Sequence, residues 1–84
     1  MVTRPEHELT ARITVDPRVM VGKPTIRGLR ITVDQILKAL AGGVTADGLL
    51  DEYPELEPED IQAVLVYAAE RVGEERVFQV TAHP

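Results

Sequence analysis

The sequence contains no cysteine, no serine and no tryptophan, and its only aromatic residues are Tyr53, Tyr67 and Phe78. The absence of cysteine excludes a disulfide framework, a cysteine-based zinc site and a thiol nucleophile. The two histidines, His7 and His83, lie near opposite ends of the chain, so a histidine site would need both termini to meet. We therefore expect no enzymatic activity, no metal, no cofactor and no small-molecule substrate.

Long apolar runs are also missing. No run approaches the roughly 18 residues that a membrane span needs, and the N-terminal sequence MVTRPEHELT lacks the apolar stretch of a signal peptide. We expect a cytoplasmic protein without membrane contact. The 84 residues, 44% hydrophobic and 27% charged, suit one small globular domain. A core of this size contributes only about 3–5 kcal/mol, so we expect a homodimer that buries more surface.

Charge is divided unevenly along the chain, although the net charge is −5. Residues 1–38 carry seven basic and four acidic side chains, whereas residues 39–84 carry two basic and ten acidic ones. This asymmetry favours two surfaces with different partners. The alternative is that short charged segments only solvate a small domain.

The N-terminal part of the chain favours a polar end followed by two short strands. Residues 1–10 show no pattern and are expected to be flexible. Alternating β-branched residues predict one strand at 12–15, and a second extended stretch covers 25–31. Residues 11–31 are therefore expected to form a basic β-strand pair.

Three helical segments are predicted within residues 32–73. Thr32 and Gln35 form a capping box at the start of the first, which a glycine pair ends. The second covers about residues 45–53. The third starts at Pro58, and the last glycine of the chain is expected to end it. Three such helices resemble the compact unit of helix-turn-helix proteins, so the fold class is mainly α.

The third predicted helix carries two adjacent apolar stripes. One, expected to enter the core, consists of Ile61, Val64, Leu65, Ala68, Ala69 and Val72. The second consists of Ala63, Val66 and Tyr67. Either the small core wraps both stripes, or the second stripe binds a second copy or another partner. We predict the partner contact, together with Phe78 and Val80 of the tail (74–84), which is a possible C-terminal edge strand.

Acidic residues surround the turn into this third helix. They are Asp51, Glu52, Glu55, Glu57, Glu59 and Asp60. The run lacks the pattern of a calcium-binding loop. We interpret it as a solvated corner between two helices.

Basic residues gather in the predicted strand pair. They are Arg12, Arg18, Lys23, Arg27 and Arg30, with only Asp16 among them. Arg27 and Arg30 flank Gly28, where a backbone can approach a phosphate closely. Two copies would form a basic ribbon suited to DNA contact. The alternative is that these arginines pair with acidic residues of their own chain or of a neighbour.

Several short strings in the chain resemble one known family, domain of unknown function 433, over about residues 11–72. The strings are Arg12–Pro17, Gly22–Pro24, Ile26–Gly28, Arg30–Ile31, Asp51–Pro54, Glu59–Ile61 and Tyr67–Ala68. Members are small bacterial and archaeal proteins, commonly grouped with VapB-type antitoxins, with a homeodomain-like helical unit. The resemblance thus implies a three-helix homeodomain-like unit, and a role in a toxin–antitoxin pair with a PIN-like ribonuclease.

This chain departs from the family pattern at Glu57, where members often carry threonine or serine. The acidic residues around that turn would repel phosphates, so we expect the basic strand pair, and not the third helix, to contact DNA. The leading prediction is a small dimeric antitoxin-like regulator that binds operator DNA and whose acidic half covers a cationic groove of a nuclease toxin. The alternative is a protein–protein interaction module with no nucleic-acid role.

Overall fold

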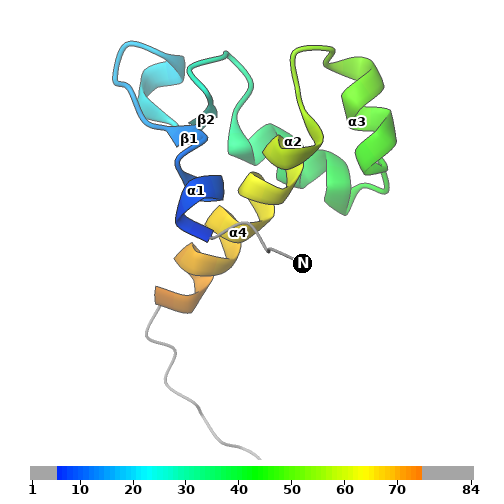
Figure 1. The fold of residues 1–84 in the computed structure, drawn as a ribbon. Coiled ribbons are helices and arrows are strands. Elements are labelled where there is room, and N and C mark those ends of the chain that lie inside the picture. The colour runs from blue at the N-terminus through cyan, green and yellow to red at the C-terminus, as the bar shows by residue number, and fades with distance from the viewer. Residues whose placement is uncertain (1–5, 75–84) are drawn as a thin grey trace, which may run out of the picture.

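The structure, a computed structural model, describes the backbone of residues 6–74 and the side chains of residues 8–73. The elements in chain order are α1 (Glu6–Thr10), β1 (Ile13–Thr14), η1 (Met20–Gly22), β2 (Thr25–Ile26), α2 (Val33–Ala41), α3 (Ala46–Glu52) and α4 (Pro58–Glu74). In Figure 1 the long helix α4 runs past α2 and α3. The strand pair and the η1 turn lie on the opposite side of the molecule from α3. The predicted class, mainly α with an N-terminal strand pair, is confirmed. The predicted C-terminal edge strand lies outside the described residues.

The strand pair is short and leads directly into the first long helix. β1 and β2 are antiparallel, with Ile13 opposite Ile26 and Thr14 opposite Thr25. The hydroxyls of Thr14 and Thr25 lie 3.1 Å apart. A further bridge joins Thr25 to Thr32, the residue before α2. The pair is therefore tied to the start of α2.

The predicted capping box of α2 is confirmed. The backbone N–H of Gln35 donates to Thr32 Oγ1 at 3.0 Å, and the backbone N–H of Thr32 donates to Gln35 Oε1 at 3.0 Å. This reciprocal pair satisfies two backbone donors that a helix start leaves free. At the other end, Gly43 takes a φ of 100°, a left-handed conformation that glycine adopts without steric cost. Val33 and Ile36 bury the inner face of α2.

Two helix boundaries need comment. Thr45 caps α3 by accepting from the Gly48 amide at 3.0 Å, close to the predicted start. The predicted end of α4 at Gly73 is wrong, because the helix continues through this residue to Glu74. Gly73 keeps a helical backbone with no positive φ, and a glycine inside a helix costs only about 1 kcal/mol.

The prediction that residues 1–10 are flexible is wrong for Glu6–Thr10, which form α1. This helix packs against α4, and Leu9 is buried. The Arg12 amide donates to the Leu9 carbonyl at 3.0 Å and joins α1 to the first strand. Five residues are too few to show a helical period, and a helix this short is stable only through its packing.

The core is aliphatic, as the scarcity of aromatic residues indicates. It contains Ile26, Ile31, Val33, Ile36, Leu49, Leu56, Ile61 and Val64. Tyr53 and Tyr67 pack only at its edge. Over residues 6–74, none of the helices has the length and apolar character needed to cross a bilayer.

Candidate functional site

The five basic residues singled out from the sequence fall into two groups. Arg12 and Arg27 turn toward the start of α4 and bind one buried carboxylate, that of Asp60. The other three, from the η1 region and the loop after β2, line an open pocket. The two groups have different environments and are described in turn.

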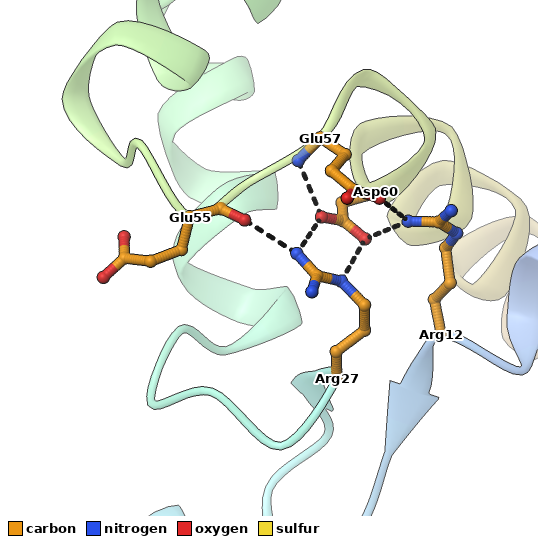
Figure 2. A network of polar contacts seen from close by, with 5 residues as sticks. All are labelled: Arg12, Arg27, Glu55, Glu57 and Asp60. Atoms are coloured by element: carbon orange, nitrogen blue, oxygen red, sulfur yellow. Dashed lines mark hydrogen bonds and ion pairs between the residues drawn. The ribbon is translucent and has the colours of Figure 1, made fainter.

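The Asp60 side chain is fully buried and accepts four hydrogen bonds (Figure 2). Its Oδ1 accepts from Arg12 Nη1 at 2.9 Å and from Arg27 Nε at 3.0 Å. Its Oδ2 accepts from Arg27 Nη2 and from the Glu57 amide, each at 2.8 Å. Because every bond has a matched donor, the protein tolerates a buried anion here.

The two guanidinium groups also contact the residues just before α4. Arg12 Nη1 donates to Glu57 Oε1 at 2.7 Å, and Arg27 Nη2 donates to the Glu55 carbonyl at 2.7 Å. Figure 2 shows Arg27 lying between Glu55 and Asp60. The network therefore fastens both strands of the basic pair to the α3–α4 turn.

Local backbone geometry places these groups. Arg27 and Gly28 have φ values of 48° and 73°, and the Leu29 amide donates to the Ile26 carbonyl at 2.8 Å, which closes a tight turn. At α4, Asp60 stands three residues after Glu57 and accepts its amide, which is half of a capping box. The same carboxylate thus starts α4 and binds the arginines.

The pKa directions agree with this geometry. Burial alone would raise the pKa of Asp60, but the hydrogen bonds from Arg27, the Glu57 amide and Arg12 outweigh it and lower the pKa below its ordinary value. The pKa of Arg12 is raised by its hydrogen bonds to Glu57 and Asp60, and that of Arg27 by its bond to Asp60. The charged forms of all three groups are therefore stabilised.

This network was only partly visible in the sequence. The alternative in which arginines pair with acidic residues of their own chain describes Arg12 and Arg27. The interpretation of the acidic run as a solvated corner is wrong for Asp60, whereas Glu55 and Glu57 are exposed. Asp60 is the third residue of the predicted helix, a position where an acidic side chain often caps the helix start. The local sequence does not identify its partners Arg27 and Arg12, which lie 33 and 48 positions away.

The second group, Arg18, Lys23 and Arg30, surrounds an open pocket of about 600 Å³. The pocket lies between the η1 region and the first turn of α2. Its remaining lining residues are Pro17, Met20, Val21, Thr32, Asp34 and Gln35. Three of the five predicted DNA contacts therefore share one concave surface.

The charges around the pocket are only partly compensated. Arg18 Nη2 pairs with Asp16 Oδ2 at 3.0 Å, and this contact lowers the pKa of Asp16 and raises that of Arg18. Asp34 pairs with Lys38 outside the lining, at 3.2 Å. Lys23 and Arg30 are exposed, and their side chains have no hydrogen-bonding or ionic partner within residues 6–74. Two positive charges are thus left uncompensated.

One rim of the pocket has a strained backbone. Met20, Val21 and Gly22 have φ values of 49°, 57° and 79°. For Val21, a β-branched residue that is 93% exposed, this left-handed conformation is an outlier. Among the described residues, no buried contact of its side chain offsets the strain, which is of order 1–3 kcal/mol. Such strain often accompanies functional sites.

The predicted partner face on α4 needs correction. Ala63 is fully buried and cannot contact a partner, while Val66 and Tyr67 are half-buried, and Tyr67 packs against the core. The large apolar residues of α4 that are exposed are instead Leu65 and Val72, at 49% and 65%, both expected in the core. The physical reason is that α1 and β1 pack on α4 in addition to α2 and α3, so the helix is covered by more elements than the predicted three-helix unit supplies.

The tail residues of the same predicted face, Phe78 and Val80, lie outside the described residues.

Comparison with known proteins gives a family but no activity. A relative, the uncharacterized protein y4eO of Sinorhizobium fredii (strain NBRC 101917 / NGR234), is 31% identical over 68 residues, which cover 79% of this chain and 31% of y4eO. The chain thus spans less than a third of that relative's length. No solved structure matches the chain. The family described as protein of unknown function (DUF433) matches residues 13–68, in agreement with the resemblance seen in the sequence. The chain belongs to the DUF433 family.

Proposed function

We propose that the protein is a DNA-binding regulator of the antitoxin type, and that the pocket face with Arg18, Lys23 and Arg30 contacts the DNA backbone. One observation carries the proposal: an acidic chain gathers three cations on one open surface, and the side chains of two of them have no partner among the residues that the structure describes. Lysine and arginine at phosphates supply most of the affinity for DNA. Arg12 and Arg27 are excluded from this contact surface because Asp60 already binds them.

The acidic residues explain why α4 is not proposed as the recognition helix. Glu57 is exposed at its start, and Glu55 is exposed in the preceding turn. Carboxylates at this end would meet the phosphates of a major groove with like charge. The exposed carboxylates of this corner, which include Asp51 and Glu52 at the end of α3, support the second half of the proposal, an electrostatic contact with a basic partner such as a nuclease toxin.

The DNA half is tested by titrating promoter DNA from the protein's own locus at two salt concentrations. We expect Lys23→Gln with Arg30→Gln to weaken binding and to reduce the salt slope by about 2, one unit for each lost phosphate contact. The matched control is Arg71→Gln with Arg76→Gln, which removes the two basic residues of the C-terminal half of the chain. Equal losses in both variants would refute the pocket as the contact surface.

The toxin half is tested separately. A nuclease-like neighbour encoded beside this chain is titrated against the wild type and against Asp51→Lys with Glu52→Lys, both exposed on α3. We expect the reversed variant to bind more weakly, and Glu70→Lys on α4 to bind as the wild type does. Unchanged binding by the α3 variant would refute the acidic contact.

We include a homodimer in the proposal, because Leu65 and Val72 expose apolar surface on α4. Light scattering of the wild type and of Leu65→Glu with Val72→Glu tests it. A dimer that the double variant converts to a monomer supports the contact, and a monomeric wild type refutes it.

A second candidate function is an interaction module with no nucleic-acid role. It is favoured by the internal pairing of Arg12 and Arg27, which removes two of the five cations expected to meet DNA. A folded wild-type protein that binds no promoter DNA at either salt concentration, alone or with its neighbour, would decide for this candidate.

A further inference from the structure

The pocket beside η1 is larger than contact with a DNA phosphate requires. Its volume of about 600 Å³ lies within the range of roughly 300–1,000 Å³ that small-molecule sites occupy. Its walls are of two kinds. Pro17, Met20 and Val21 provide apolar surface on one side, and Lys23 and Arg30 provide positive charge. A pocket with an apolar wall and a few convergent polar groups is the usual form of a ligand site.

The charge of the pocket defines the charge of its ligand. Arg18 is neutralised by Asp16, and Asp34 is neutralised by Lys38. Lys23 and Arg30 remain, so the uncompensated charge is +2. A phosphate monoester carries about −1.5 to −2 at pH 7, whereas a phosphodiester or a carboxylate carries only −1. The guanidinium of Arg30 can also donate two parallel hydrogen bonds to phosphate oxygens.

Two further features raise the positive potential and shape the rim. The first turn of α2 supplies Thr32, Asp34 and Gln35 to the lining, so the positive end of the helix dipole lies at the pocket. The left-handed turn at Met20–Gly22 keeps Val21 at the rim with 93% of its surface exposed. Backbone hydrogen bonds from Gly22 to Val19 and from Lys23 to Met20 close this turn and present the Val21 side chain to the pocket, where the apolar part of a ligand can contact it.

We propose that this pocket binds a small phosphate monoester of nucleoside-monophosphate size. Lys23 and Arg30 bind the phosphate, and Met20 and Val21 contact the organic part. This site does not depend on DNA binding, although it uses cations of the proposed DNA surface. A ligand bound there would compete with DNA and would make the regulator responsive to a phosphorylated metabolite.

The experiment is a titration of the isotope-labelled full chain, without DNA, followed by amide chemical shifts at constant ionic strength. The probes are AMP, cyclic AMP and inorganic phosphate. We expect saturable shifts around Val21, Lys23 and Gln35 with AMP. The dissociation constant should be about tenfold lower for AMP than for cyclic AMP. The diester carries one negative charge fewer and therefore forms one charge-assisted hydrogen bond fewer.

Variants locate the site. Lys23→Gln with Arg30→Gln should lose the AMP response, and Arg71→Gln with Arg76→Gln, which also removes two cations, should keep it. The absence of saturable AMP shifts, or an AMP response that survives in the first variant, would overturn the site. Equal affinities for AMP and cyclic AMP would overturn the proposal that the site prefers a dianionic phosphate. Inorganic phosphate that binds as tightly as AMP would overturn the proposed apolar contact with the organic part. Because no DNA is present, these outcomes are separate from the failure of the proposed function.

Discussion

Replacement of Asp60 by alanine is the most informative perturbation of this fold. The change removes the acceptor of four hydrogen bonds and leaves the guanidinium groups of Arg12 and Arg27 without their buried counterion. Removing one member of a buried ion pair costs about 3–5 kcal/mol. The side chains of Arg12 and Arg27 are 20% and 34% exposed, so both can partly turn to water. We therefore expect the lower end, about 3 kcal/mol, for Asp60→Ala.

Urea denaturation followed by circular dichroism at 222 nm measures this loss of unfolding free energy. A single core of this size supplies about 3–5 kcal/mol, so the variant should be close to unfolded at room temperature, with a Tm about 12–24 °C lower. Asp60→Asn keeps the shape and one acceptor and should lie between the alanine variant and the wild type. Glu57→Gln is the control, because Glu57 is 54% exposed and loses one bond worth less than about 1 kcal/mol. If the unfolding free energy of Asp60→Ala lies within about 1 kcal/mol of the wild-type value, the reasoning from the buried ion pair is refuted.

Three other predictions concern stability. The pKa of Asp60 is lower in the folded chain, so the unfolded chain binds a proton at this carboxylate first as the pH falls. The contribution of Asp60 to the unfolding free energy should therefore be complete above about pH 5 and decline below about pH 4. Urea midpoints across this range should show the decline in the wild type, and Asp60→Asn should lack it. Val21→Asn should raise the unfolding free energy by about 1 kcal/mol, because asparagine tolerates the left-handed backbone; a lower Tm would contradict the strain argument. Thr32→Val should lower the unfolding free energy by about 1 kcal/mol, since it removes the cap of α2. An unchanged urea midpoint for that variant would contradict this.

The features that were predicted from the sequence are local ones. Thr32 and Gln35 stand three residues apart, and their capping box needs no information from the rest of the chain. The strand pair and the helices α2, α3 and α4 follow in the same way from alternation, helical period and glycine or proline boundaries. The helix bounds agree within a few residues because capping and backbone propensity act over one turn. The second extended stretch, predicted over 25–31, is wrong beyond Ile26, because Arg27 and Gly28 adopt a left-handed turn.

The features that were missed depend on contacts between distant residues. Helix α1 has no helical pattern of its own, yet its packing on α4 changes which residues of α4 are exposed. Ala63 is consequently buried and Leu65 exposed, the reverse of the prediction. The division of the five cations is of the same kind, because only the folded chain brings Arg12 and Arg27 to Asp60 and leaves Lys23 and Arg30 around a pocket.

The Asp60 network has a consequence for how far this small chain can be divided. The helices between residues 32 and 73 look like a separable module, but α4 begins at a carboxylate whose counterions come from the strand pair. An excised helical fragment would expose the hydrophobic surface that Ile26 covers and would leave that anion with no arginine. We therefore expect gene fusions, truncations and domain swaps that cut between β2 and α2 to break the unit, so the strand pair and the helices have to be engineered together.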